Sequence, residues 1–377
     1  MTRVAAAAAA EPAANNLVAD AQGELPLPWL REPLDTALAG QRGHALLLHA
    51  APGLGALPFV LTLAQAWLCE TATGGVRPCG RCGSCKLVQA RLHPDLVVLL
   101  PESLRRQHHW PLRDDKLEGE DSKRKPSRQI RIPEVRALID WAHQTSSRGQ
   151  GKVAVLHPAE AMNAAAANAL LKTLEEPPLG TRLLLSTADP ALLLPTVRSR
   201  CQHLRLAAPS QAQALAWLTA QGVEQPQVLW AAAGGRPLDA LALARAGVGA
   251  KAWADLPQAV ARGQAGALAG WAVPQVVDAL QKLCADALAL AAGAAPRYFP
   301  VASLPPLAGL HRLPTLLAWA DELARVARHD EHPWNEALLL DALLAHAGAA
   351  LSTLAPPGPS AGGAQATRRA GGFDTLP

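Results

Sequence analysis

The sequence lacks an uninterrupted apolar stretch approaching the ~20 residues of a membrane-spanning helix, so no membrane span is expected. It also has little net charge, because 35 Lys and Arg against 31 Asp and Glu leave +4. Proteins that live on a phosphate backbone usually carry a larger basic excess, so this balance permits nucleic-acid contact without demanding it. Hydrophobic residues are plentiful at 50% of 377, which excludes wholesale disorder and predicts two or three domains.

The N-terminus does not have the pattern of a secretory signal. One arginine and a short alanine run meet Glu11 and Pro12 at once, without leucine or valine bulk, so a low-complexity leader is expected. Cysteines are few and clustered: four of the six fall within seventeen residues and two stand alone. This distribution fits a metal site in a reducing compartment better than a disulfide framework, and it predicts a cytoplasmic protein.

Short apolar runs of strand length alternate with longer helical patterns in the first half of the chain. Such an order predicts an α/β domain with a mostly parallel sheet. The expected strands are His44–His49, Asp95–Leu100, Lys152–Leu156 and Arg182–Ser186, and the expected helices are Leu57–Leu68, Pro133–Thr145 and Asn163–Glu175. After about residue 208 the pattern becomes that of packed helices.

These patterns divide the chain into five parts. The predicted parts are a disordered leader (1–24), an α/β domain (25–208), a helical lid (209–248), a C-terminal helical domain (249–351) and a disordered tail (352–377). Within the α/β domain, residues 102–128 form an insert with 14 charged positions of 27. A solvated loop is the simpler interpretation, and a loop that contacts DNA or a partner through Lys123, Arg124 and Lys125 is the alternative.

The strongest chemical signal is a set of four cysteines, Cys69, Cys79, Cys82 and Cys85. Two short Cys-x2-Cys spacings let a tight turn present successive thiolates to one zinc ion at tetrahedral angles. A redox pair is the alternative, but overlapping pairs with a fourth cysteine suit a dithiol switch poorly. Four protein ligands leave no open position, so the zinc is expected to be structural in a knuckle spanning residues 69–85.

Residues 51–57 (APGLGAL) occupy the strand–loop–helix context of a phosphate-binding loop, with Gly53 and Gly55 in place. A working loop continues with lysine and then serine or threonine, and this sequence has Ala56 and Leu57 there. The Lys152–Leu156 strand ends in His157, where paired acids would hold magnesium. Loss at both positions predicts an ATPase fold without its chemistry, and no tightly bound ATP is expected.

Ser199, Arg200 and Cys201 follow the last predicted strand. Arg200 is either an ordinary surface cation or an arginine finger, a guanidinium directed at a neighbouring subunit's γ-phosphate. Cys201 is expected to pack as a small hydrophobic residue.

These motifs, in this order with HPAEAMNAAAANALLKTLEEPP (residues 157–178), resemble the AAA+ subunits of the bacterial DNA polymerase III clamp loader. The family includes the ATP-hydrolysing gamma/tau subunit and the delta-prime subunit, whose own nucleotide site is inert. Ala56, Leu57 and His157 stand where gamma/tau carries lysine, threonine and an acid, and Leu238 stands at its sensor arginine. These departures match the delta-prime type, which keeps the Ser-Arg-Cys finger.

The resemblance implies a subunit without intrinsic ATPase activity that belongs to the DNA polymerase III holoenzyme and is nucleoid-associated through the replisome. It implies a hetero-pentameric ring with delta and gamma/tau subunits, a C-terminal helical collar, and loading of the sliding clamp onto primed DNA. Two rival functions stay open: an active, gamma/tau-like ATPase and a stand-alone zinc-dependent DNA-binding protein. Ala56 and Leu57 count against the first, and the modest net charge counts against the second.

Overall fold

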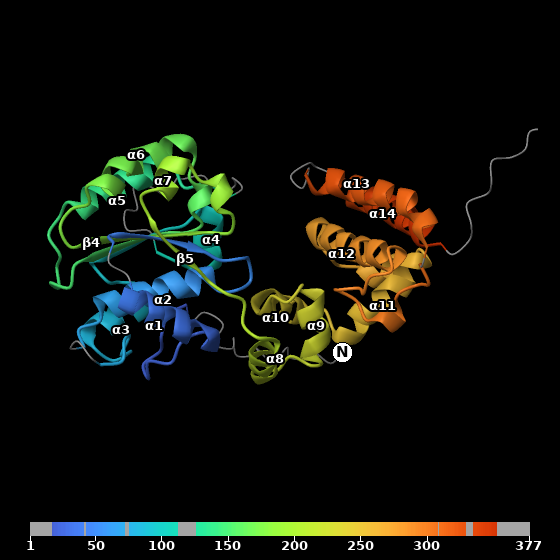
Figure 1. Cartoon of the computed structure of the whole chain (residues 1–377), viewed down its shortest axis with the longest axis horizontal. Helices are drawn as coiled ribbons and strands as arrows, with labels where there is room; N and C mark the ends of the chain where they lie inside the picture. The colour runs from blue at the N-terminus through green and yellow to red at the C-terminus, as the bar shows by residue number, and fades with distance from the viewer. Residues whose placement is uncertain are drawn as a thin grey trace, which may run out of the picture. The chain divides into compact units, whose positions relative to one another are not determined.

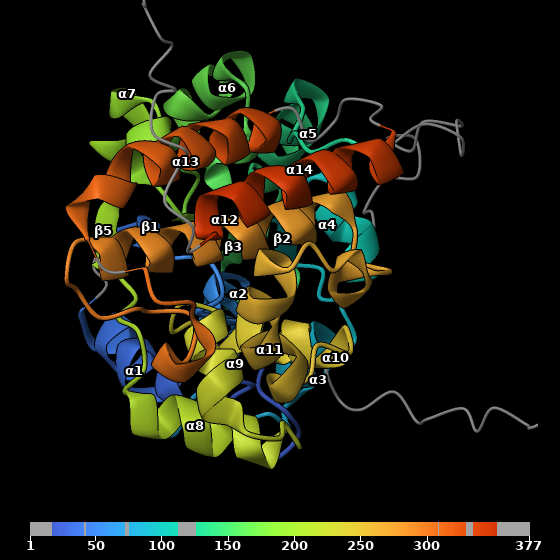
Figure 2. The same cartoon turned by 90° about the vertical axis from the view of Figure 1, so that its right-hand side faces the viewer.

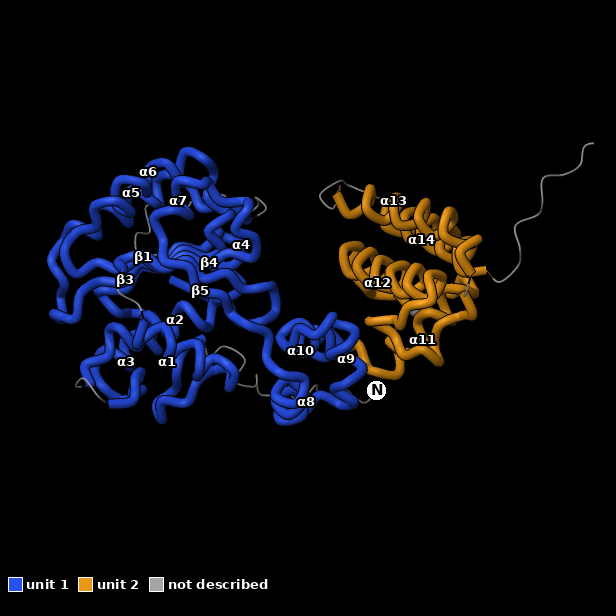
Figure 3. Tube along the Cα trace, in the orientation of Figure 1, with its two compact units in different colours: residues 1–247 blue, residues 248–377 orange. Residues whose placement is uncertain are grey.

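The computed structural model describes residues 17–40, 43–71, 75–111, 126–307, 309–328 and 335–352. The chain divides into two compact units, residues 1–247 and 248–377 (Figure 3). The predicted tail beyond residue 352 and the first sixteen residues of the predicted leader lie outside the described residues.

Unit 1 is built on a five-stranded sheet in which all four neighbouring pairs run parallel. The strand order is β2-β3-β4-β1-β5, and Figure 2 shows β5, β1, β3 and β2 labelled in that sequence across the sheet. The strands are β1 (Ala45–His49), β2 (Leu96–Leu99), β3 (Lys152–Leu156), β4 (Thr181–Thr187) and β5 (Gln202–Arg205). The predicted α/β class, a parallel-sheet domain followed by helices, is confirmed.

Helices cover both faces of this sheet, as its doubly apolar strands require. Alternate residues of β1 face opposite layers: Leu46 and Leu48 pack under α1 and α2, whereas Leu47 packs under α5 and α6. Figure 1 shows the two helical layers on either side of the strands. One layer holds α1 (Arg31–Gly40), α2 (Ala56–Leu68) and α3 (Gly83–Gln89), and the other holds α5 (Ile132–Ala142), α6 (Ala164–Glu175) and α7 (Pro195–Arg198).

The helix α2 lies at the centre of the first layer and is buried at eleven of its thirteen positions. The segment before α1 packs against it: Leu17, Val18 and Ala19 are buried. The N–H of Ala19 donates to Gln65 Oε1 at 2.8 Å, and Gln65 Nε2 donates back to Ala19 O at 3.0 Å. Packed structure therefore begins inside the region expected to be a disordered leader. The backbone N–H and C=O of Ala19 supply the hydrogen bonds that the buried side-chain amide of Gln65 requires.

The charged insert is partly structured. Residues Glu102–Gln107 form the helix α4, and Trp110 after it is 7% exposed. The first part of the predicted loop is therefore a helix, and none of the residues of α4 is buried, as expected for a solvated segment. Residues 112–125, which include Lys123, Arg124 and Lys125, lie outside the described residues.

The edge strand β5 was not expected from the sequence. Its residues are mostly exposed, so it lacks the apolar run that marks the other strands. It leads into three helices that complete unit 1, α8 (Gln211–Ala220), α9 (Pro226–Ala232) and α10 (Pro237–Arg245). Ser210 begins α8 with a capping box, in which the N–H of Gln213 donates to Ser210 Oγ at 3.2 Å.

The regular elements among the described residues of unit 2 are all helices. Trp253 stacks on Phe299 with ring centroids 4.7 Å apart, and the buried Asp286 accepts hydrogen bonds from the N–H groups of Arg297, Tyr298 and Phe299. Its helices are α11 (Ala250–Ala261), α12 (Val273–Ala291), α13 (Leu313–Ala327) and α14 (Glu336–Leu351). Short 3-10 turns in the two units are η1 (Pro28–Leu30), η3 (Ala159–Ala161), η4 (Pro190–Leu192), η5 (Ala265–Leu268), η6 (Val301–Ser303) and η7 (Leu310–Arg312). None of the described helices combines the length and the apolar character needed to cross a bilayer.

Candidate functional site

The loop between β1 and α2 has the backbone of a phosphate-binding loop. Gly53 and Gly55 have φ values of +74° and +98°, which side chains rarely adopt. The space beside both glycines is already taken. A Cβ on Gly53 would lie 2.7 Å from Asp239 Oδ1, and a Cβ on Gly55 would collide with Leu27 Cδ1. Residues of the chain itself therefore occupy the side of the loop where a Cβ would point.

A pocket of about 730 Å³ opens at this loop between the sheet and the helices α8 and α10. Its charged lining is mainly acidic, since four carboxylates face one arginine, Arg245, besides two histidines. The carboxylates belong to Asp20, Glu24, Glu160 and Asp239. Among its described lining residues, the pocket has no lysine to pair with the β- and γ-phosphates of a triphosphate, and the charge of Asp239 beside Gly53 is offset by its ion pair with Arg236.

The helix α10 holds the loop directly. The N–H of Leu238 donates to Gly53 O at 3.2 Å, and Asp239 forms an ion pair with Arg236 at 2.6 Å. Leu238 also lines the pocket, so an alkyl group stands where the resemblance places a sensor arginine. This acid beside the loop had no sequence signal, because only the fold brings residue 239 to residue 53.

His157, at the end of β3, lines the same pocket. Its Nδ1 lies 2.7 Å from Ser186 Oγ on β4. Burial, together with the nearby His108, lowers the pKa of His157 to about 4. A neutral imidazole therefore stands at neutral pH in the position of the magnesium-binding acids, and it supplies no charge for a hydrated cation.

The four predicted cysteines come together at one point. Their Sγ atoms all lie within 4.8 Å of one another, with Cys79–Cys85 and Cys69–Cys82 Sγ pairs at 4.0 Å. Zinc with thiolates at ~2.3 Å in a tetrahedron needs Sγ separations of about 3.8 Å, so the cluster can hold one ion with small adjustments. The helix α2 ends at Cys69 and α3 starts after Cys82, so the site joins two helix ends.

Backbone donors already point at the sulfurs. The N–H of Cys82 donates to Cys79 Sγ and the N–H of Cys85 donates to Cys82 Sγ, both at 3.4 Å. Burial raises the pKa of Cys85, and of Cys82 despite these amide contacts. A bound cation would offset that cost by stabilising the thiolates, which is the usual coupling between metal binding and deprotonation.

A polar network that the sequence analysis missed connects this knuckle to the sheet. Glu70 follows Cys69, and its carboxylate accepts hydrogen bonds from Ser84 Oγ and from Arg148 Nε, both at 2.9 Å. His93 Nε2 lies 3.1 Å from the same Ser84 hydroxyl. Asp95 then accepts the N–H groups of Ser147 and Arg148 at 2.8 and 2.9 Å. The loop before β3 is thereby tied to the cysteine knuckle.

Arg200 follows α7 and does not line the pocket of its own chain. Its Nε donates to Glu175 Oε1 at 2.8 Å, and its Nη1 donates to Thr196 O at 2.9 Å. One third of the side chain remains exposed. The neighbouring Cys201 is buried, which raises the pKa of its thiol to about 12, as suits a packed hydrophobic residue.

Comparison with known families accords with this arrangement. Residues 32–210 match the family described as "DNA polymerase III, delta subunit". Over 228 residues the chain is 38% identical to DNA polymerase III subunit delta′ of Pseudomonas aeruginosa, covering 59% of this chain and 62% of that protein. Over this region the chain is similar to DNA polymerase III delta′ subunits.

A second delta′ subunit, from Yersinia pestis, is 42% identical over 199 residues, covering 52% of each chain. The tau subunit of Escherichia coli is also similar, at 30% identity over 183 residues, which is 47% of this chain and 24% of that protein. The chain spans between half and about three fifths of the length of these first delta′ relatives. The family match, residues 32–210, includes the loop between β1 and α2, the cysteine knuckle and Arg200.

Proposed function

We propose that this chain is the delta′ subunit of a DNA polymerase III clamp loader. In this role it hydrolyses no ATP itself, and it places Arg200 in a neighbouring subunit's nucleotide site. Similarity to delta′ subunits over the α/β region supports the family part of this proposal. The chemistry of the pocket supports the absence of ATP hydrolysis in this chain, and the position of Arg200 supports its role in a neighbouring subunit's site.

The part of this proposal that the chain hydrolyses no ATP rests on the acid-lined pocket, where Asp239 lies beside Gly53. Ala56 and Leu57 supply neither the charge nor the hydroxyl that Mg·ATP needs, and both line this pocket. An active gamma/tau-like ATPase would need at least the lysine. The relation to tau therefore extends to the fold of this region but not to its catalysis.

The finger half rests on where Arg200 lies. Arg200 does not line the pocket of its own chain, so it does not act on a nucleotide there. Its side chain is partly exposed and is oriented by two hydrogen bonds. A guanidinium held in this way can reach a second subunit's γ-phosphate and stabilise the charge that develops during transfer. Ser199 Oγ accepts a hydrogen bond from Arg200 Nη1 at 3.4 Å, and the next residue, Cys201, is buried.

The proposed partners follow from the same role. They are the delta and gamma/tau subunits in a hetero-pentameric ring, with the helices of unit 2 as the collar, and the sliding clamp and primed DNA through the complex. Zinc bound by Cys69, Cys79, Cys82 and Cys85 serves structure only, because four protein ligands close its coordination shell.

Reconstitution of the loader tests this proposal. Arg200→Ala should leave folding and ring assembly unchanged, while the rate at the affected ATPase site falls by about 10³–10⁵ and clamp loading falls with it. Arg200→Lys should rescue poorly, because a point charge lacks the planar fork. Arg198→Ala is the matched control, since Arg198 donates to Pro190 O on its own chain. Normal loading by Arg200→Ala, or a larger defect in Arg198→Ala, would refute the finger.

A further inference from the structure

The strand β2 is an edge strand with an open outer side. Asp95 O accepts from Val153 N–H at 2.9 Å and Leu99 O accepts from His157 N–H at 3.0 Å, so alternate residues of β2 face β3. Val98 therefore directs its N–H and C=O away from the sheet. Among the described residues neither group has a hydrogen-bond partner.

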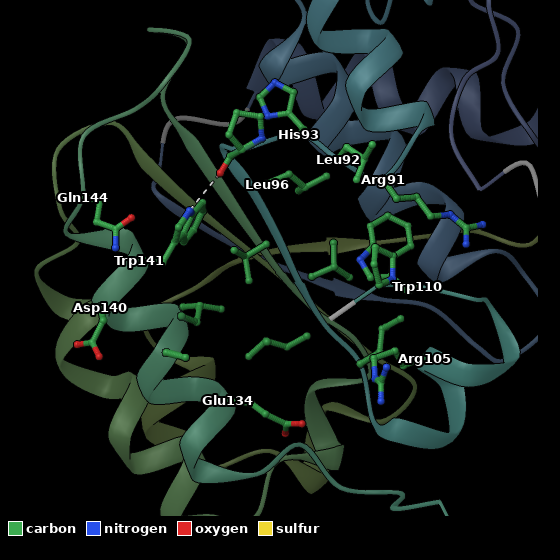
Figure 4. Close-up of a pocket in the computed structure, with 18 residues that line it drawn as sticks. Arg91, Leu92, His93, Leu96, Arg105, Trp110, Glu134, Asp140, Trp141 and Gln144 are labelled. Atoms are coloured by element: carbon green, nitrogen blue, oxygen red, sulfur yellow. Dashed lines mark hydrogen bonds between the residues drawn. The ribbon is translucent and has the colours of Figure 1, made fainter. Parts of the chain in front are cut away.

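A groove of about 650 Å³ runs along this edge (Figure 4). Its floor is the strand itself, from Leu96 to Leu100, and its two walls belong to the two helical layers of unit 1. An exposed edge of this kind is normally covered or blunted, because it templates pairing with another strand. In this groove the charged side chains lie on the walls, and the backbone of β2 remains accessible to a partner strand.

One wall is apolar. Leu92 is 67% exposed, and the ring of Trp110 stands beside it. The charge of Arg91 on this wall is already engaged, since its guanidinium lies 5.3 Å from the Trp110 centroid and donates to His109 O at 2.7 Å. An aliphatic side chain pointing this way would bury surface without desolvating an unpaired charge.

The other wall is the helix α5, where Asp140 and Gln144 are exposed above the buried Trp141. The indole N–H of Trp141 donates to Pro94 O at 3.2 Å, a hydrogen bond drawn as a dashed line in Figure 4. Asp140 beside it supplies a carboxylate to the groove. At the far end, Glu134 on the same wall stands opposite Arg105. The α5 wall therefore favours a basic side chain.

We propose that this groove binds an extended segment of a partner protein by strand addition to β2. The backbone of the segment pairs with Val98, and its alternate side chains face the two walls. An aliphatic residue lies against Leu92 and Trp110, and a lysine or arginine lies against Asp140. The site is on the opposite side of the sheet order from β5 and shares no residue with the nucleotide pocket, so it does not depend on the finger proposal.

A labelled peptide of alternating valine and lysine, measured by fluorescence anisotropy with the full chain, is the probe. Saturable binding is expected, weakened about fivefold when the central peptide nitrogen is methylated, because one strand hydrogen bond is lost. Val98→Pro should have a similar effect and still fold, since proline is tolerated where an edge strand's N–H faces outward. Val98→Thr keeps the N–H and should bind normally.

Charge reversal gives an independent arm that does not touch the backbone. Asp140→Lys should weaken the valine–lysine peptide about threefold and favour a valine–glutamate peptide instead. Glu224→Lys, at an exposed acid far along the chain, should change neither affinity. Equal binding of the methylated and unmethylated peptides, or indifference to Asp140→Lys, would overturn the proposal.

Two other occupants would also overturn it. Concentration-dependent dimers that Val98→Pro abolishes would identify a second copy of this chain as the occupant. Peptide binding that appears only after removal of residues 112–125 would assign the groove to that segment.

Discussion

Arg200 and Glu175 form an ion pair that joins α7 to the C-terminal end of α6, with Nε donating to Oε1 at 2.8 Å. Glu175 directly precedes Glu176 and the two prolines that end α6, so its place at the helix terminus is fixed. The finger proposed for trans action is thus oriented before any neighbour binds.

Glu175→Ala should therefore reduce ATP hydrolysis of the reconstituted loader at the interface served by Arg200, by about tenfold, because one charge-assisted hydrogen bond is lost. The decrease should be smaller than that of Arg200→Ala. In an Arg200→Ala background the second change should have no effect. The steady-state ATPase rate with clamp and primed DNA measures the effect of each single variant and of the double variant.

Glu176→Ala is the control for this cycle, since Glu176 is exposed and adjacent but is not the partner of Arg200. If the Glu175 and Arg200 effects simply add, the two residues act separately and the positioning role is wrong.

Restoring the missing nucleotide chemistry should require more than the loop residues. Ala56→Lys with Leu57→Thr should leave Mg·ATP affinity weak, because Asp239 still stands at Gly53. Adding Asp239→Ala should strengthen binding about tenfold further, since an adjacent like charge is removed. Isothermal calorimetry on the isolated chain distinguishes the variants. Micromolar affinity in the unaltered chain would instead indicate an active, gamma/tau-like subunit.

Metal removal should destabilise unit 1 selectively. Purified protein should contain about one zinc per chain, and Cys79→Ser should abolish it and lower the melting temperature of unit 1. Cys284→Ala, at a buried cysteine of α12, should keep the metal. Metal analysis together with thiol titration checks both, and a metal-free wild type with six titratable thiols would contradict the assignment.

His157 should make stability depend on pH in one window. Its folded pKa of about 4 lies below the ordinary value of about 6.5, so the unfolded chain binds the proton first as pH falls. The stability that the neutral ring contributes is present above pH 6.5 and is lost between 6.5 and 4, at up to roughly 1.4 kcal/mol per pH unit. His157→Gln should flatten the denaturation free energy across this window, whereas His143→Gln at an exposed position should not.

The parts of this fold that were predictable are those encoded by local apolar patterns. β1, β3 and β4 are apolar runs that are buried almost throughout, β2 is an apolar run that is partly buried, and α6 carries its own cap, Asn163, and its own stop. β5 escaped prediction because it pairs with β1 through its backbone while its side chains stay mostly exposed. Its strand character comes from the partner rather than from its residues.

The candidate site shows the same division. The cysteine spacing and the missing lysine are local, so they were evident in the sequence. Asp239 beside Gly53 and Glu175 beside Arg200 join residues far apart in the chain, and no spacing rule encodes such contacts. Glu70 and Arg148, 78 positions apart, are a third example.

The Glu70–Arg148 pair joins the cysteine knuckle to the loop before β3, so we expect the two to open together. Loss of the ion would release Glu70, then Arg148, and with it the amides of Ser147 and Arg148 that Asp95 protects. Hydrogen exchange at these two amides would then rise with chelation, although neither residue lies near a cysteine in the sequence. The cysteine cluster at the end of α2 would in this way control how often the loop that leads into β3 opens.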